Sequence, residues 1–107
     1  MASQDDILKL QQDIVLTLKN IYDPEIPVNI YDLGLIYEIN VDDELNVVLK
    51  MTLTAPNCPI ADVLLDDVTK QVSAVTGVKS FRLDLVFEPP WNKDMMSEEA
   101  LLELGFL

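Results

Sequence analysis

Apolar residues near the start of the chain repeat with the period of an α-helix. The positions that share one face are Ile7, Leu10, Ile14, Leu18 and Ile21. Their spacing predicts a helix over residues 5–20. Ser3 and the acidic residues after it suit the amino-terminal end, and Pro24 prevents the helix from continuing far beyond Tyr22.

Two segments that alternate between apolar and polar residues follow, over residues 35–41 and 45–54. Such alternation is typical of strands that bury one face, and the short acidic stretch between them predicts a β-hairpin. The residues predicted to face the core in the second strand are Val47, Leu49, Met51 and Leu53. Thr52 and Thr54 are predicted to face solvent as ordinary strand residues.

The second half of the chain contains another helical pattern and a third alternating segment. Residues 60–76 are predicted to form a helix that Gly77 ends, and residues 78–87 a strand. The apolar face of this helix comprises Ile60, Val63, Leu64, Val68, Val72 and Val75. Ser97 begins a short last helix that Gly105 closes.

The order α-β-β-α-β-α predicts an α+β fold, a two-layer α/β sandwich. Its helices should cover the apolar face of a small three-stranded sheet. A chain of 107 residues suits one domain, spanning residues 1–107.

Composition narrows the range of functions. Seven Lys and Arg stand against nineteen Asp and Glu, which gives a net charge of −12 distributed over both halves of the chain. Such a surface repels phosphate backbones and anionic headgroups, so we expect neither nucleic acid nor a membrane as partner. The chain has three glycines and no GK[ST] motif, so we do not expect a nucleotide-driven enzyme.

The chain contains no histidine and a single cysteine, Cys58. Without histidine, the chain cannot form a Ser-His-Asp triad or a His-ligated zinc site. One cysteine cannot form an internal disulfide, and a lone thiol suits the reducing cytoplasm.

Cys58 is predicted to lie at the end of a strand and directly before a helix, where backbone N–H groups and the helix dipole stabilise a thiolate. Pro59 suits the first helical position. Asp62, Asp66 and Asp67 oppose the effect with negative charge. Position alone leaves two interpretations open, a reactive thiol and a small buried hydrophobic residue.

Three other residues stand beside loops. Asp23 and Asp32 flank the first loop and suit either metal ligation or the capping of turns, of which capping is the favoured interpretation beside Pro and Gly. Trp91, after two prolines, suits either a hydrophobic plug or a partner surface.

Several motifs are specific in combination. They are DPEIPV at 23–28, YDLGLIY at 31–37, MTLTAPNCP at 51–59, PPW at 89–91 and MSEEA at 96–100. Together they resemble the metal–sulfur cluster assembly family that includes SufT and PaaD, over nearly the whole chain and in the same order. The last two motifs favour the SufT-like branch. Asn57 is a departure, because the family usually has Gly before Cys-Pro.

The resemblance implies an auxiliary factor rather than an enzyme, which helps to mature iron–sulfur proteins. Its partners would be the iron–sulfur assembly machinery and apo client proteins. Cys58 would be the reactive cysteine and Asp23 and Asp32 the loop acids, with iron or a cluster as transient cargo. Because clusters normally take about four ligands, either a homodimer contributes two copies of Cys58 or one copy holds the cargo briefly.

Two other functions stay open. The chain could be a protein-binding adaptor in which Trp91 and the proline-rich loops recruit partners while Cys58 is merely packed. It could also be a thiol redox protein in which Cys58 is oxidised to a sulfenic acid.

Overall fold

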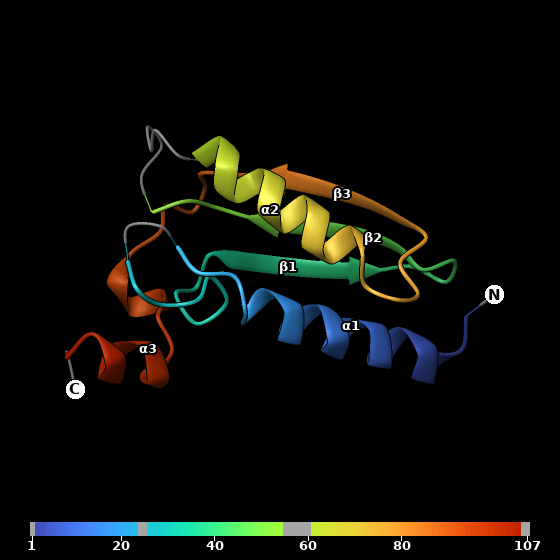
Figure 1. Cartoon of the computed structure of the whole chain (residues 1–107), viewed down its shortest axis with the longest axis horizontal. Helices are drawn as coiled ribbons and strands as arrows, with labels where there is room; N and C mark the ends of the chain where they lie inside the picture. Colours follow the sequence, from blue (N-terminus) through green and yellow to red (C-terminus); the bar gives the residue numbers. More distant parts are fainter. Residues whose placement is uncertain (1, 24–25, 55–60, 106–107) are drawn as a thin grey trace.

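The structure is a computed structural model that describes residues 2–23, 26–54 and 61–105 (Figure 1). Its elements are α1 (Gln4–Leu18), β1 (Ile36–Val41), β2 (Asn46–Met51), α2 (Ala61–Ser73), β3 (Ser80–Leu85), the 3₁₀ turn η1 (Lys93–Met95) and α3 (Glu98–Glu103). The predicted order α-β-β-α-β-α is confirmed, and the short turn η1 is an addition to it. Over the described ranges, none of the helices is both long and apolar enough to cross a bilayer.

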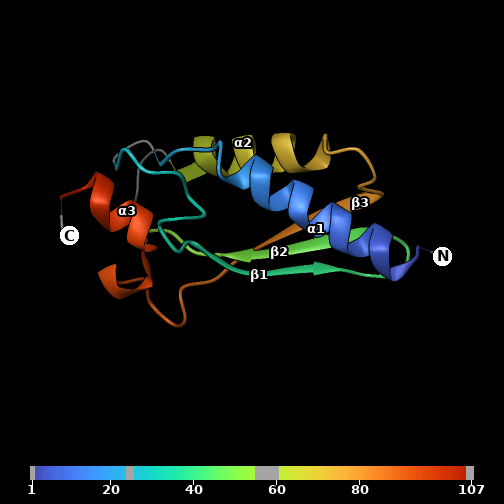
Figure 2. The ribbon, with the colours of Figure 1, turned by 90° about the horizontal axis from the view of Figure 1, so that it is seen from below.

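The sheet has the order β1-β2-β3, with β1 antiparallel to β2 and β2 parallel to β3. The first pair is the predicted hairpin. The second pair needs a crossover connection, which α2 supplies. Both α1 and α2 lie on one side of the sheet, as Figure 2 shows. The predicted two-layer α/β sandwich is therefore confirmed.

The core lies between this sheet face and the two long helices. Its members from the regular elements are Leu10, Ile14 and Leu18 of α1, Leu64, Val68 and Val72 of α2, and Val47, Leu49 and Met51 of β2. Val47 and Leu49 stand opposite Phe81 and Leu83 of β3 in the pairing register. Burial of these apolar side chains is the main force that joins the layers.

The amino-terminal end of α1 carries the expected cap. Ser3 Oγ accepts a hydrogen bond from the N–H of Asp6 at 3.1 Å, and the Asp6 carboxylate accepts one from the N–H of Ser3 at 3.2 Å. This reciprocal pair is a capping box, and it satisfies two backbone donors that the helix leaves open.

Two details of the predicted elements are wrong. Val63 is 69% exposed, although its spacing suggested the apolar face of α2. Val63 lies about 100° around the helix axis from Leu64, which is buried in the core. Because the buried face of α2 is narrow, it includes Leu64 and leaves Val63 exposed. The third strand ends at Leu85, and Phe87 beyond it is exposed. Ile60 and Cys58 lie outside the described residues.

Candidate functional site

The connection between α1 and β1 carries both acidic candidates and is an ordered structure. Tyr22 and Asn29 form an isolated antiparallel bridge. The N–H of Ile30 donates to the carbonyl of Ile21 at 2.8 Å, and the N–H of Asp23 donates to that of Val28 at 3.2 Å. Buried apolar side chains anchor the connection from within, namely Ile21, Val28, Ile30, Leu33 and Leu35. The prediction of a structured connection rather than a linker is confirmed.

Asp23 holds the first turn of this connection. Its side chain is buried, with 8% of the residue exposed, and its Oδ1 accepts a hydrogen bond from the N–H of Ile26 at 3.1 Å. This arrangement is a side-chain turn of the kind that Asp forms beside Pro. The favoured capping interpretation of Asp23 is therefore confirmed.

Asp32 is held in a similar way, six residues after Ile26. Its N–H donates to Oδ1 of Asn29 at 2.8 Å, while its own Oδ2 accepts from Nδ2 of Asn29 at 2.8 Å. The two side chains thus close a reciprocal ring. An ionised carboxylate has about four acceptor sites, so the bond from Asn29 orients Asp32 without using its full capacity.

The segment that follows β3, residues 86–97, forms hydrogen bonds to the same connection. We call this segment the clamp. Nε1 of Trp91 donates to the carbonyl of Leu33 at 2.7 Å, and the N–H of Ser97 donates to the carbonyl of Asp32 at 2.8 Å. The indole also packs partly buried against the core. This placement supports the interpretation of Trp91 as a plug.

A bulge in β1 adds a third link. The pairing register between β1 and β2 shifts between Ile36 and Glu38, so Tyr37 is an extra residue. Its hydroxyl donates to the carbonyl of Pro89 at 2.6 Å. The segment after β3 therefore bonds to the chain at Asp32, Leu33 and Tyr37.

Thr52 is a residue whose environment sequence reasoning predicted wrongly. Alternation placed it on the solvent face, but it is 1% exposed, and its N–H donates to the carbonyl of Leu35 at 2.8 Å. The predicted strand ran to Thr54, but β2 ends at Met51, so strand alternation no longer sets the direction of the Thr52 side chain. Among the described residues, nothing hydrogen-bonds to its Oγ1. Only its place directly before the 55–60 segment could have drawn attention to it.

Cys58 itself lies in residues 55–60, outside the described residues. The described strand β2 ends at Met51, three residues before the predicted end at Thr54, and the described helix α2 begins at Ala61, so the predicted position of Cys58 between them stays a prediction. No group of three or more His, Cys, Asp or Glu in the described ranges could hold a metal ion. Asp23 and Asp32 together supply fewer ligands than the roughly four that a cluster takes, so the described residues alone do not form a cluster site.

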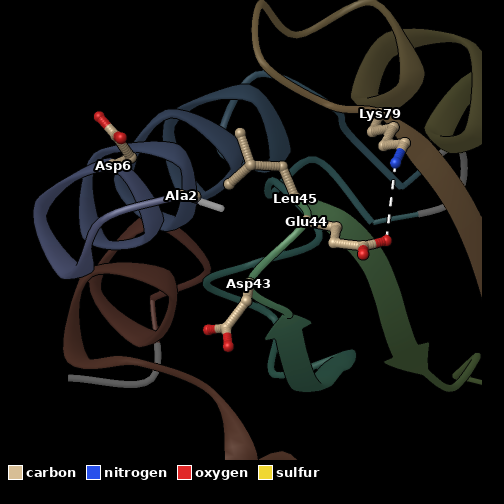
Figure 3. A pocket seen from close by; sticks show the side chains of 6 residues that line it. All are labelled: Ala2, Asp6, Asp43, Glu44, Leu45 and Lys79. Carbon is tan, nitrogen blue, oxygen red and sulfur yellow. Dashed lines mark ion pairs between the residues drawn. The ribbon is translucent and has the colours of Figure 1, made fainter.

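Two shallow hollows lie near polar side chains. The first, about 420 Å³, is lined by Ala2, Asp6, Asp43, Glu44, Leu45 and Lys79 (Figure 3). Its Lys79 and Glu44 form an exposed ion pair at 3.6 Å. It contains none of the predicted site residues and lies at the β1–β2 turn.

The second hollow, about 550 Å³, lies beside the clamp. Its lining residues are Gly34, Ile36, Tyr37, Glu38, Lys50, Glu88, Pro89 and Met95. Apolar side chains make much of its wall, and an ion pair between Lys50 and Glu38 at 3.4 Å forms part of the rim. Gly34, at the end of the connection that carries Asp32, forms part of its wall.

Electrostatic perturbation is found at the turn between β1 and β2. The side chain and the N–H of Asn46 donate to the carboxylate of Asp42, and these bonds hold the pKa of Asp42 below its ordinary value. The effect belongs to the hairpin.

The fold is a small α+β domain. Its connection between α1 and β1 carries the carboxylates of Asp23 and Asp32 and is hydrogen-bonded to the segment after β3. A family model described as "Iron-sulfur cluster assembly protein" matches residues 11–82. The chain belongs to that family.

Individual relatives agree. The chain is 59% identical over 103 residues to an "Fe-S protein maturation auxiliary factor" of Porphyromonas gingivalis, covering 96% of this chain and 98% of the relative. It is 39% identical over 85 residues to the "Fe-S protein maturation auxiliary factor SufT" of Staphylococcus aureus, covering 79% and 97%. The crystal structure of a domain of unknown function from Bacillus anthracis superposes with a TM-score of 0.89 at 33% identity, covering 98% of this chain and all of that one.

Proposed function

We propose that this chain is an auxiliary factor in the maturation of iron–sulfur proteins. The observation that carries the proposal is its 59% identity, over nearly the full length of both chains, to a relative with that name. The chain acts by binding iron or a cluster and passing it on, and it catalyses no reaction of its own. Its partners are the iron–sulfur assembly machinery and apo client proteins, and it works in the cytoplasm, which suits a lone cysteine.

Cys58 is the group that we assign to the cargo. A thiolate is a soft ligand for iron, and the segment that carries it joins a strand end to a helix start, where a thiolate is favoured. Asp23 and Asp32 hold the connection between α1 and β1 in shape, and the Asp32 carboxylate has acceptor capacity beyond its bond from Asn29. Because one chain offers too few ligands for a lasting cluster, the cargo is held in transit.

The experiment replaces Cys58 by Ser in cells that depend on this chain and measures the activity of a client iron–sulfur enzyme. Serine is nearly isosteric with cysteine but lacks a soft thiolate at neutral pH. We expect client activity to fall to the level of a strain without the chain, while the free energy of unfolding changes by about 0.5 kcal/mol or less. Thr69→Ser, an exposed change on α2, is the matched control and should leave both unchanged.

Other results would assign Cys58 differently. Destabilisation of about 1–3 kcal/mol would mean that Cys58 is a buried hydrophobic residue, because the serine hydroxyl would be buried without a partner. Full client activity at unchanged stability would favour a protein-binding adaptor, for which the hollow beside Tyr37 and Pro89 offers a surface. Spectra after anaerobic reconstitution with iron and sulfide test the cargo directly.

A further inference from the structure

Helix α1 has a second apolar stripe that faces away from the core. Leu8 is 49% exposed and Leu16 is 61% exposed. Together with Gln11, Gln12 and Val15 they line a shallow hollow of about 420 Å³. Figure 2 shows α1 in front, with no other drawn helix or strand over it.

The stripe carries no charge, although the chain has a net charge of −12. Its ends are charged, with Asp5 at one end and Lys19 at the other. Residues 5, 8, 12, 15 and 19 are separated by three and four residues in turn, the period of helices that pack at a shallow angle of about 20°.

The stripe is also symmetric about its centre. Gln12 is the midpoint in sequence of Leu8 and Leu16 and also of Asp5 and Lys19. A second, antiparallel copy of α1 on a two-fold axis at Gln12 brings each Leu8 to a Leu16 and each Asp5 to a Lys19. The two Gln12 amides meet at the axis, where each can donate and accept a hydrogen bond.

We propose that this stripe of α1, formed by Leu8, Gln11, Gln12, Val15 and Leu16, is the interface of a homodimer. A second copy is the occupant that fits, because the two-fold arrangement pairs apolar with apolar side chains and opposite charges with each other. A partner recruited by the acidic surface as a whole would instead need a strongly basic face. Lys19 lies at the end of the stripe, with its Nζ 5.4 Å from the centroid of the Tyr31 ring.

This dimer does not bring together the two connections that carry Asp23. The carboxyl-terminal ends of antiparallel helices point in opposite directions, and α1 leads at Leu18 into that connection. Leu18 is six residues from Gln12, or about 9 Å along the axis at about 1.5 Å per residue. The stripe contains none of the residues assigned to the cargo, so we expect the dimer to form without iron or sulfide, and it goes beyond the function proposed above.

The first test is sedimentation equilibrium of the full chain without iron or sulfide, at about 0.15 M salt to screen the net charge. We expect a reversible monomer–dimer equilibrium in the wild type. The double variant Leu8→Gln/Leu16→Gln should weaken it by about tenfold or more, because the interface loses its two largest apolar side chains. Val63→Gln, at an exposed apolar position on α2, is the matched control and should dimerise like the wild type.

The second test exchanges the charges at the ends of the stripe. Asp5→Lys alone and Lys19→Asp alone each place like charges together and should weaken the dimer several-fold. The combined change restores opposite charges across the axis and should restore the dimer. The combined change is also the least favourable for the helix dipole, so recovery cannot come from a better helix. Circular dichroism verifies that each variant is folded.

Three outcomes would overturn the proposal. They are a wild type that stays monomeric to about 1 mM, a dimer that survives Leu8→Gln/Leu16→Gln, and a combined charge exchange that does not recover. If the wild type is monomeric and the Leu8→Gln/Leu16→Gln variant no longer supports the maturation of a client enzyme, the stripe binds a different protein and not a second copy. Cys58→Ser is expected to dimerise like the wild type. If the dimer is not found, the proposed maturation role is unaffected, and if the maturation role is disproved, the proposed dimer is unaffected.

Discussion

At the scale of single residues, the clamp depends on a position where only glycine fits. Gly34 has a φ of +85°, in the left-handed region, and it ends the connection that carries Asp32. A Cβ at this position would overlap the carbonyl of Met95 and approach the Met95 Cβ to 2.8 Å. Because the obstacle is backbone rather than the end of a flexible side chain, it cannot move without shifting η1.

Gly34→Ala should therefore lower the free energy of unfolding by more than its backbone strain alone. The left-handed conformation costs an alanine about 1–2 kcal/mol, and the overlap adds to that cost. Gly105→Ala is the matched control, because Gly105 has a φ of +81° and no atom within 4 Å of the added Cβ. Urea unfolding of both variants makes the comparison. Equal losses would show that the segment after β3 does not press on Gly34.

Individual candidates were predictable from the sequence to different degrees. The turn-capping roles of Asp23 and Ser3 follow from local chemistry and were predicted. The burial of Thr52 was not, because the alternating pattern continues to Thr54 whereas β2 ends at Met51. Periodicity reports local geometry, whereas burial depends on what packs on top.

At the scale of elements, the hairpin between β1 and β2 has its own electrostatic support. Oδ1 of Asp42 accepts hydrogen bonds from the N–H groups of Glu44 and Asn46, both at 2.9 Å, and Oδ2 accepts from Nδ2 of Asn46 at 3.0 Å. Asn46 in turn accepts a hydrogen bond from Ser80 Oγ at 2.7 Å, at the start of β3. One carboxylate thus organises the turn through Asn46, which also bonds to the third strand.

This arrangement makes the hairpin sensitive to acid. The bonds from Asn46, followed by weaker contributions, hold the pKa of Asp42 below its ordinary value in the folded chain. A depressed folded pKa means that the stabilisation is present above the unfolded pKa of about 3.9 and is lost as the pH falls through the lower folded pKa. Asp42→Ala should therefore be less stable than the wild type near neutral pH, and the difference should shrink below about pH 4.

Urea midpoints of the wild type and Asp42→Ala at neutral and acidic pH measure that difference. Asp43→Ala is the control, because it changes the neighbouring acid in the same turn and removes a similar charge. A gap between the wild type and Asp42→Ala that stays constant with pH would show that the side chain acts by packing and not by its charged hydrogen bonds.

The regular elements were largely predictable because their signals are local. The helical period located α1 and α2, and alternation located the three strands to within a few residues. The errors come where a local pattern meets a tertiary limit. Val63 follows the helical spacing but lies beside the face of α2 that contacts the core. Phe87 continues the alternating pattern, but the pairing of β3 with β2 ends at Leu85.

At the scale of the whole molecule, the candidate site joins segments that are far apart in sequence. The connection between α1 and β1 supplies the acids, and the segment after β3 holds this end of the fold through bonds that span 52 to 65 residues. The sequence named Asp32 and Trp91 separately but contained no signal that they belong to one structure. The pairing arises because both lie at the same end of the sheet once the core has formed.

Trp91 is the strongest test of that coupling. Its indole N–H donates at 2.7 Å to the carbonyl of Leu33, a fully buried residue, so Trp91→Phe keeps an aromatic ring but leaves this carbonyl without the bond. We expect a loss of about 1–3 kcal/mol in stability. We also expect faster amide hydrogen exchange in residues 29–35, with little change in the turn between β1 and β2.

The control for Trp91→Phe is Leu102→Ala, at an exposed position in α3 of the same segment, which should leave the exchange of residues 29–35 unchanged. A uniform rise in exchange across the sheet for Trp91→Phe would mean that the indole stabilises the fold in general and does not hold the loop. A local rise would show that the shape of the loop bearing Asp32 is set from the other end of the chain. Client maturation should then fall in Trp91→Phe while Cys58, Asp23 and Asp32 are all intact, because the loop would be present but no longer fixed.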